Sequence, residues 1–272
     1  MLHRVLLKVS YLSTLTLVAA WLLPLAYVGY RAVSCRGVST TSANWCNVSN
    51  FSGNDSASLA TAILNSFVIG LMTTALTLLL ASGLIIPGLT RNRTWYHLLA
   101  PAVALGCIPP IALLIPHNIL VNYVPAIGSS AWLLASFHSL IALPLALIII
   151  IPRLQRLHGN DIDEAGLFDL ARSDGLSPEF YLFQILLPNL RSEFLLAGVI
   201  AFSVSWGELL YSGVFRASPA DRTLPVFISK FETGYEILWT SLFVATAFSC
   251  IIVVALSVAA VRLLNQELIS DD

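Results

Sequence analysis

The chain has 272 residues, of which 57% are hydrophobic and only 11% are charged. An average soluble domain carries about 25% charged residues, so this chain has too little polar surface to cover a water-facing globule. Its formal net charge of -1 argues against the basic surface of a nucleic-acid-binding protein. Its four cysteines form no C-x-x-C pair and no Cys/His cluster, which indicates neither a zinc site nor a disulfide scaffold. We therefore expect a protein of the lipid membrane, with no nucleic acid and no metal.

Charge-free stretches predict the membrane-spanning helices, because an ionised side chain at the centre of a bilayer costs at least about 2.5 kcal/mol. A span needs about 20 apolar residues. The stretch 94–152 is long enough for two spans, joined by a turn of polar and helix-breaking residues over 116–128. The expected fold class is all-α and integral to the membrane, with six transmembrane helices over 9–29, 60–87, 97–117, 130–151, 194–216 and 239–263.

The distribution of basic residues predicts the orientation. When both termini are placed in the cytoplasm, nine of the 14 Lys and Arg residues fall on the inner side, and the short loop with Arg91 and Arg93 contains no acid. Arg4 and Lys8 precede the first apolar stretch as in a signal peptide, but that stretch is too long and no convincing cleavage site follows. We expect an uncleaved anchor in a multi-pass protein of the plasma membrane.

Two cysteines, Cys35 and Cys46, lie in a Ser- and Asn-rich loop on the predicted outer side. That compartment is oxidising, so a local disulfide and two unpaired thiols both remain open, because the sequence does not give the separation of the two Cα atoms. The expected domains are the first helix with this loop (1–58), a transmembrane domain (59–264) and a cytoplasmic tail (265–272).

The largest hydrophilic segment on the predicted inner side covers 152–193, with seven acids and four bases. It is much longer than a connection between antiparallel helices requires. Its local signals predict a helix, a break with Gly175 in the left-handed conformation, and a second helix that begins at Ser177. Pro188 then marks the return to the membrane.

The spacing in this segment resembles a known motif. Asp169-Leu170-Ala171-Arg172-Ser173-Asp174-Gly175 is followed after nine residues by Ile185-Leu186-Leu187-Pro188. This is similar to the EAA loop of membrane subunits of binding-protein-dependent ABC importers, whose pattern is E-A-A, two residues, D-G, nine residues, I-x-L-P. The resemblance implies a cytoplasmic coupling helix between spans 4 and 5 that docks on an ATPase subunit. It assigns the coupling role to Asp169, Ala171, Asp174, Gly175 and Pro188.

Two features of this motif limit what it implies. Leu170 replaces the first Ala of the family pattern and Asp169 replaces its Glu, which keeps the charge but shortens its reach. For Asp169 the alternative role is that of a solvated carboxylate on a helix surface. Asp174 and Gly175 are expected to form the helix break rather than a contact, since Gly allows a positive φ.

Shorter motifs extend the resemblance over about 60–263 and favour the carbohydrate branch of these permeases. Asn65-Ser66-Phe67 resembles the N-S motif of the second span, and Ile108-Pro109-Pro110 with Leu114-Ile115-Pro116 is similar to the M-I-P and L-I-P pair. Thr223-Leu224-Pro225-Val226 matches T-L-P-V in the last outer loop. Trp206-Gly207-Glu208 resembles W-N-E in the fifth span, with Gly207 in place of Asn. The tail lacks the Gly-rich ending of maltose-type subunits.

Glu208 is the acid within a predicted span. Counted from Phe194, it lies about 21 Å along a core about 30 Å thick, where it cannot face lipid. It either lines the translocation path and accepts hydrogen bonds from a polyol, which we favour, or pairs with Arg216 or caps a broken helix. Trp206, Gly207 and Tyr211 flank it as further path candidates, but for Trp206 and Tyr211 the preferred interpretation is that of interfacial anchors near the outer boundary.

Three histidines, His97, His117 and His138, are each expected near a helix end. Their separation by about one span makes solvation at helix ends the preferred interpretation over a metal site or a proton relay.

The resemblance implies a permease subunit of an ATP-driven ABC importer in the bacterial inner membrane, forming half of the path for a sugar or related polyol. The implied partners are a second, usually unlike permease, two ATPase subunits and an extracytoplasmic solute-binding protein. The chain itself has no Gly-Lys pair of a P-loop, so we expect no bound cofactor and no enzymatic activity, with ATP and Mg held by the ATPase. The alternatives are a polyamine, phosphonate or inorganic-anion permease and, remotely, an intramembrane hydrolase using Glu208 and a histidine.

Overall fold

The computed structural model describes residues 59–90, 108–123, 130–158, 170–171, 173–177, 180–216, 218–230 and 239–270, with isolated positions at 23, 26, 27, 30, 100, 101, 104 and 106. Within these residues all regular structure is helical, which confirms the all-α expectation for them. The main helices are α2 (Leu59–Thr90), α4 (Pro110–Tyr123), α6 (Ala131–His158), the π-helix η2 (Tyr181–Leu186), α9 (Leu187–Asn189), α10 (Arg191–Gly207), α11 (Leu210–Phe215), α12 (Leu224–Ser229) and α13 (Trp239–Ser270).

Two of the described helices are long and apolar enough to cross a membrane, over Leu59–Ile85 and Ala131–Leu157. A third span results if Tyr181–Asn189 and Arg191–Gly207, which are bent by 66°, are taken together. The helix α13 contributes a shorter apolar stretch, Ala245–Ala260. The structure is thus that of an integral membrane helical protein, and the full set of six spans stays a prediction. Most of the expected helix 9–29, and both Cys35 and Cys46, lie outside the described residues.

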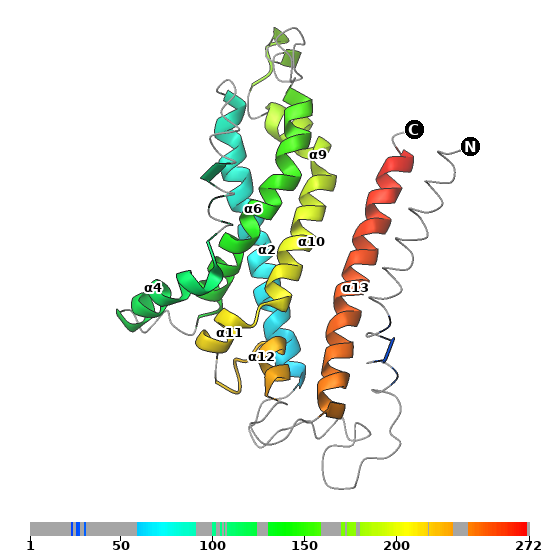
Figure 1. Ribbon diagram of the computed structural model, residues 1–272. Coiled ribbons are helices and arrows are strands. Elements are labelled where there is room, and N and C mark those ends of the chain that lie inside the picture. Colours follow the sequence, from blue (N-terminus) through cyan, green and yellow to red (C-terminus); the bar gives the residue numbers. More distant parts are fainter. Residues whose placement is uncertain are drawn as a thin grey trace, which may run out of the picture.

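The helices α2, α6 and α10 lie side by side and form the central three-helix core (Figure 1). Small residues allow α2 and α10 to approach closely. A Cβ atom on Gly70 would lie 2.7 Å from a ring carbon of Phe202, and the Thr74 hydroxyl donates to the carbonyls of Gly70 at 2.8 Å and Gly198 at 3.4 Å. Helices in lipid usually associate through close contact of small residues, because the lipid is as apolar as the helices and no hydrophobic effect drives them together.

The helix α13 runs beside this core, with its C-terminal end at the same end of the bundle as η2 and α9 (Figure 1). A hydrogen bond fastens it to α10, from Trp206 Nε1 to Ser249 Oγ at 2.9 Å. The helix α12 lies at the opposite end, against the start of α2 and next to α13.

Two expected helix boundaries were wrong. The turn expected over 116–128 begins later, because α4 continues through Pro116 to Tyr123 and projects sideways from the core (Figure 1). There Asn122 Nδ2 donates to Asn118 Oδ1 at 3.0 Å, one helical turn apart, so two amides expected in a turn bond to each other along the helix. The expected single helix 194–216 is divided into α10 and α11 by a break at Glu208 and Leu209.

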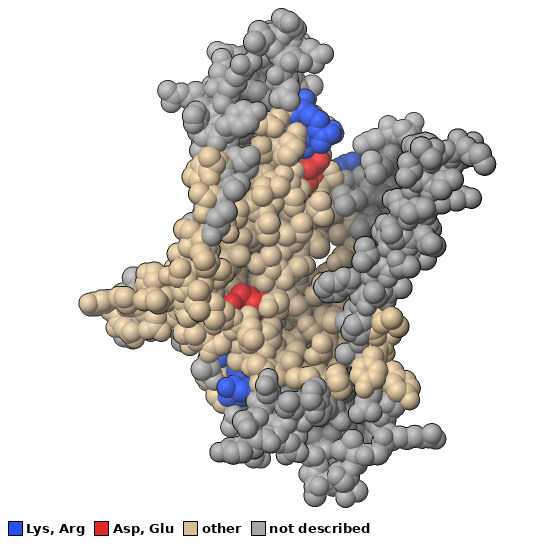
Figure 2. All heavy atoms as spheres, in the orientation of Figure 1, with Lys and Arg blue, Asp and Glu red and all other residues tan. Residues whose placement is uncertain are grey.

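The charges of the described residues gather towards the two ends of the molecule (Figure 2). Between them the visible face is almost entirely uncharged, apart from an acidic patch near mid-height (Figure 2). An uncharged belt bounded by charged ends is the arrangement expected of a membrane-embedded bundle.

Candidate functional site

The segment from 170 to 190, here called the elbow, contains the helix break that the sequence predicts. Gly175 has a φ of +80°, the left-handed conformation that Gly adopts without steric cost. The N–H of Leu176 donates to the carbonyl of Ala171 at 3.0 Å, which is the six-residue closing bond of a Schellman cap. The prediction for Gly175 is confirmed.

The second half of the elbow begins where the sequence predicts. The hydroxyl of Ser177 accepts a hydrogen bond from the N–H of Phe180 at 3.2 Å, and the Ser177 carbonyl accepts one from Tyr181 at 3.0 Å. An N-cap Ser satisfies the third helical N–H in this way. The chain then continues through η2 and α9 to a 66° bend at Leu190, where α10 begins. Pro188 lies exposed in α9, one turn before the membrane helix rather than at its first residue.

Residues of the elbow that face the helix bundle attach it to the core. Ala171 is 6% exposed and belongs to the same buried cluster as Leu154 of α6, Leu190 and Ala197. Its small side chain therefore suits a packed position. At the base of the elbow, Arg153 Nε of α6 lies 3.7 Å from Glu193 Oε1 of α10.

Residues of the elbow that face away from the helix bundle leave apolar side chains exposed. We call this surface the elbow patch; it consists of Leu170, Phe180, Phe183 and Leu187, which are 40–63% exposed. Phe180, Phe183 and Leu187 follow the i, i+3, i+7 spacing of an amphipathic α-helix in the sequence, a signal that motif matching missed, although the chain forms a π-helix over 181–186. Asp174 is exposed beside the break, and Asp169 lies outside the described residues.

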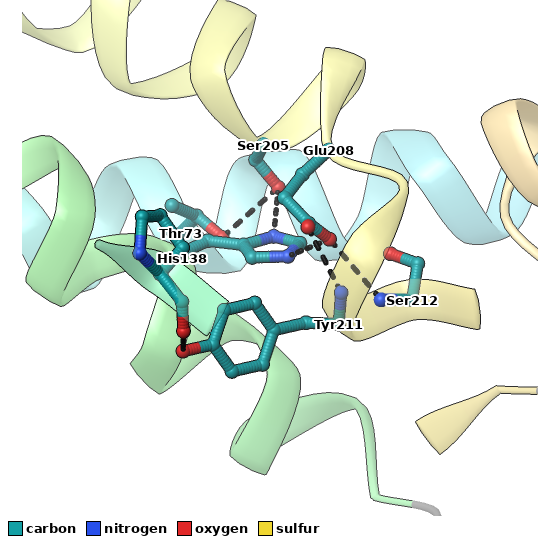
Figure 3. A network of polar contacts seen from close by, with 7 residues as sticks. Thr73, His138, Ser205, Glu208, Tyr211 and Ser212 are labelled. Carbon is teal, nitrogen blue, oxygen red and sulfur yellow. Dashed lines mark hydrogen bonds and ion pairs between the residues drawn. The ribbon is translucent and has the colours of Figure 1, made fainter. Parts of the chain in front are cut away.

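A second group of polar residues lies at the break between α10 and α11 (Figure 3). Glu208 ends α10, and its carboxylate accepts hydrogen bonds from the backbone N–H of Tyr211 at 2.9 Å and of Ser212 at 3.1 Å. It therefore caps α11. Of the two structural alternatives for Glu208, capping of a broken helix is the one observed, while Arg216 bonds the carbonyl of Asp221 at 2.9 Å.

His138 joins this group from α6. Its Nε2 lies 3.1 Å from Glu208 Oε2 and its Nδ1 lies 2.8 Å from Ser205 Oγ of α10. The Thr73 hydroxyl of α2 donates to Ser205 at 3.2 Å. A carboxylate can only accept, so Nε2 carries a proton, and the Ser205 hydroxyl can donate to Nδ1 of a neutral ring. With 0% side-chain exposure, His138 is not at a solvated helix end, and that expectation was wrong.

The other expected path residues surround this network in different environments. Trp206 is buried and stacks on Phe202 with ring centroids 5.5 Å apart. Tyr211 is also buried, and its hydroxyl donates to the carbonyl of Pro110 at 2.7 Å. Gly207 is exposed, and a Cβ atom at this position would meet nothing within 4 Å. Of the three, Gly207 alone presents a free surface beside the break.

The end of the bundle opposite the elbow carries a third arrangement, formed by Asn65 and Ser66 of α2, which we call the outer clamp after the predicted orientation. Asn65 Nδ2 donates to the carbonyls of Ala220 at 2.9 Å and Arg222 at 3.1 Å. The Ser66 hydroxyl accepts from the N–H of Leu224 at 2.7 Å. Two motifs that resemble the same family separately, at 65–67 and 223–226, are therefore parts of one structural unit.

The polar network has the composition of a hydrolase triad, Ser, His and an acid. Its geometry serves another purpose: both Glu208 oxygens cap α11, and Ser205 and His138 are buried inside the core. Among the described residues there is also no group of three or more His, Cys, Asp or Glu side chains that could hold a metal ion.

Known proteins similar to the chain are transport permeases. The sulfoquinovosyl glycerol transport system permease protein SmoH of Agrobacterium fabrum is 27% identical over 179 residues, 65% of this chain and 60% of that protein. The inner membrane ABC transporter permease protein YcjP of Escherichia coli is 29% identical over 101 residues, 36% of this chain and 34% of that protein. The chain is similar to ABC transporter permeases, including carbohydrate-type ones.

A third relative extends the comparison beyond sugars. The spermidine/putrescine transport system permease protein PotC homolog of Mycoplasma pneumoniae is 27% identical over 220 residues, 77% of this chain and 69% of that protein. No family model matches the chain. The match spans less than two thirds of the first two of these permeases.

Proposed function

We propose that the chain is a permease subunit of an ATP-driven ABC importer that forms half of a translocation path and couples to a cytoplasmic ATPase. The observation that carries the proposal is the elbow, because it combines a rigid inner face with an uncovered apolar outer face. A connector between two helices needs neither. A docking element needs both, since it must be gripped on one side and transmit force on the other.

In this proposal the elbow patch and Asp169 face the ATPase. Gly175 and Ser177 fix the shape of the element, and Ala171 keeps it attached to α6 and α10. Asp174, next to the helix break, and Pro188, in α9, are exposed and complete the coupling set. Two ATPase subunits would hold ATP and Mg, and this chain would hold no cofactor.

The path is proposed to pass the break between α10 and α11, between this chain and a second, unlike permease. Gly207 offers an exposed backbone there, and Glu208 contributes a carboxylate whose side chain is 11% exposed. Trp206 and Tyr211 are buried by contacts within this chain, so a solute reaches them only after a rearrangement. An extracytoplasmic binding protein would deliver the solute at the end that carries the outer clamp.

For the solute we propose a sugar or related polyol. The support is the set of carbohydrate-type motifs, and the sulfoquinovosyl glycerol permease among the relatives is named for a sugar derivative. The spermidine/putrescine relative supports a polyamine as the alternative. Uptake into proteoliposomes, with competition by sugars, polyols, putrescine, phosphonate and phosphate, separates these candidates. Accumulation of putrescine without any response to sugars would remove the carbohydrate proposal.

Coupling is tested in the assembled complex with its ATPase and binding protein. Asp169→Lys and Gly175→Leu should each abolish the ATP hydrolysis that the loaded binding protein stimulates, while membrane insertion stays intact. Gly83→Leu is the matched control, because it places the same side chain in open space on α2, outside both the elbow and the break. Full stimulation in both elbow variants would refute the coupling role.

A further inference from the structure

The break between α10 and α11 leaves backbone N–H groups that the chain itself satisfies. The first N–H groups of a helix have no partner within it. In the interior of a membrane protein such groups must be satisfied by the protein itself. The Glu208 carboxylate satisfies those of Tyr211 and Ser212, so the residue that ends α10 also caps α11.

One imidazole contacts both α10 and the break itself. His138 bonds Ser205, which precedes the break on α10, and Glu208, which lies in it (Figure 3). Through Ser205 the same network reaches Thr73, so α2, α6, α10 and α11 are linked by consecutive hydrogen bonds. A ring held on both nitrogens has a single orientation, which in turn fixes the position of the carboxylate.

Further contacts hold α11 against its neighbours. The Tyr211 hydroxyl bonds the carbonyl of Pro110 at 2.7 Å, and its ring stacks on Phe137 of α6 with centroids 5.4 Å apart. Phe215, the last residue of α11, also lies against Phe137, with ring centroids 6.0 Å apart. The short helix α11 is therefore joined to the core along its length.

We propose that His138 and Glu208 hold the two parts of the broken helix together, so that α10 and α11 move as one rigid body. We call these contacts the splice. His138 is then a positioning residue: it acts on the path through Glu208 and does not contact the solute. A displacement of the inner end of α10, where the elbow joins it, reaches α11 and the outer clamp without being absorbed at the break. The splice is a property of the chain, whereas its use in carrying ATPase closure outwards rests on the proposed function.

The splice also assigns Glu208 its task. Its carboxylate receives three donors from the chain itself and is 11% exposed. Three of its roughly four acceptor positions are therefore used within the chain. Capping of α11 is its first role, and a solute meets exposed Gly207 and the remaining acceptor position of the carboxylate.

The test measures the distance across the break in the full complex. Spin labels replace Leu196 on α10 and Val214 on α11, both about 40% exposed, in a chain whose four cysteines are replaced. A continuous helix between these two positions would be roughly 27 Å long, and the break changes that separation, which pulsed electron resonance measures directly. The chain with intact His138 should give one narrow distance distribution. His138→Leu should lose that single peak, and His138→Gln, whose amide can donate to Glu208, should restore it.

Trp206→Phe is the control, because it removes a hydrogen bond of α10 that does not cross the break. A narrow distance distribution in His138→Leu would contradict the splice. Equal broadening of the distance distributions of His138→Leu and Trp206→Phe would contradict it as well. If His138→Leu does not assemble, the same distance is measured in Ser205→Ala and Glu208→Gln, and a narrow distribution in both would contradict the splice. If the distance measurements show an intact splice but the elbow variants do not change ATP hydrolysis, the proposed importer function is refuted and the splice is not.

Discussion

The two ends of α10 are both breaks, and they are stabilised by opposite means. At the inner end the chain bends by 66° at Leu190, and a buried apolar cluster that includes Tyr181 and Leu186 holds the bend. At the outer end the chain breaks at Glu208, and hydrogen bonds from His138 and two backbone N–H groups hold it. One junction is fixed by packing and the other by polar contacts.

The difference follows from the surroundings of each break. At the inner break the backbone bonds within the chain, from the N–H of Leu190 to the carbonyls of Leu186 and Leu187 and from the N–H of Phe194 to the carbonyl of Leu190, so apolar packing is enough to fix the geometry. In the membrane interior no water is present, and each unsatisfied backbone group costs several kcal/mol. Neighbouring helices must therefore supply polar side chains to the outer break. The same interruption of a helix thus requires different residues at different depths.

The largest effect expected from this comparison is that of Glu208→Leu. The substitution leaves two N–H groups of α11 and the His138 Nε2 proton without an acceptor, each at about 1–3 kcal/mol, so the bundle should lose about 4 kcal/mol. Unfolding of the purified chain in detergent measures this. If Glu208→Leu unfolds like the original chain, the outer break does not depend on polar contacts.

At the inner break the matching substitution is Leu190→Ala. This side chain is 1% exposed within the cluster, and its truncation should cost about 3 kcal/mol through lost burial and the cavity left behind. Leu187→Ala, at a side chain 40% exposed, should change the stability of the isolated chain by less than about 1 kcal/mol. The same detergent assay compares them, and equal losses would contradict the packing of the elbow.

A smaller difference is expected between two glycines. A Cβ atom would meet nothing within 4 Å at Gly175 or at Gly207, but only Gly175 has a positive φ. Gly175→Ala should therefore cost about 1–2 kcal/mol, and Gly207→Ala about zero. The hydrogen-exchange rate of the amides next to the substituted position should rise in Gly175→Ala only. A similar rise in both variants would show that the positive φ of Gly175 does not determine the cost of the substitution.

The smallest effect concerns the ion pair at the base of the elbow. Arg153 and Glu193 lie 3.7 Å apart, with side chains 39% and 19% exposed. Such a pair is worth about 0.5 kcal/mol and is screened by salt. Glu193→Gln should thus lower stability slightly at low ionic strength and not at all at about 1 M salt. A loss that persists in high salt would mean that the elbow is held electrostatically.

Local signals of the sequence predicted the elbow well. Gly175 and Ser177 act within one turn of their own position, so their chemistry determines the cap without knowledge of the rest of the chain. The apolar stretches at 60–87 and 130–151 likewise correspond to α2 and α6, because burial in lipid depends on composition over a whole span. The true end of α2 at Thr90 lies at the limit of its charge-free stretch, and that of α6 at His158 lies beyond it.

The polar network could not be predicted from any one segment, because its members come from three spans. A signal was nevertheless present. Thr73, His138 and Ser205 are polar residues in apolar stretches, and polar groups at such depths face the bundle interior and bond to one another. Treating each histidine alone led to the wrong expectation for His138. A broken helix capped by Glu208 was one of the alternatives left open, because one carboxylate in an apolar run does not reveal which N–H groups it will cap.

The outer clamp has a consequence for how such a chain can change over time. Asn65 and Ser66 hold main-chain atoms at 220, 222 and 224, and main-chain atoms are the same whatever residue occupies the position. A new side chain at Ala220 leaves its carbonyl available to the Asn65 amide. The fold of this surface is thereby encoded in α2, and residues such as Ala220 can diversify to suit new partners without altering the shape they are displayed on.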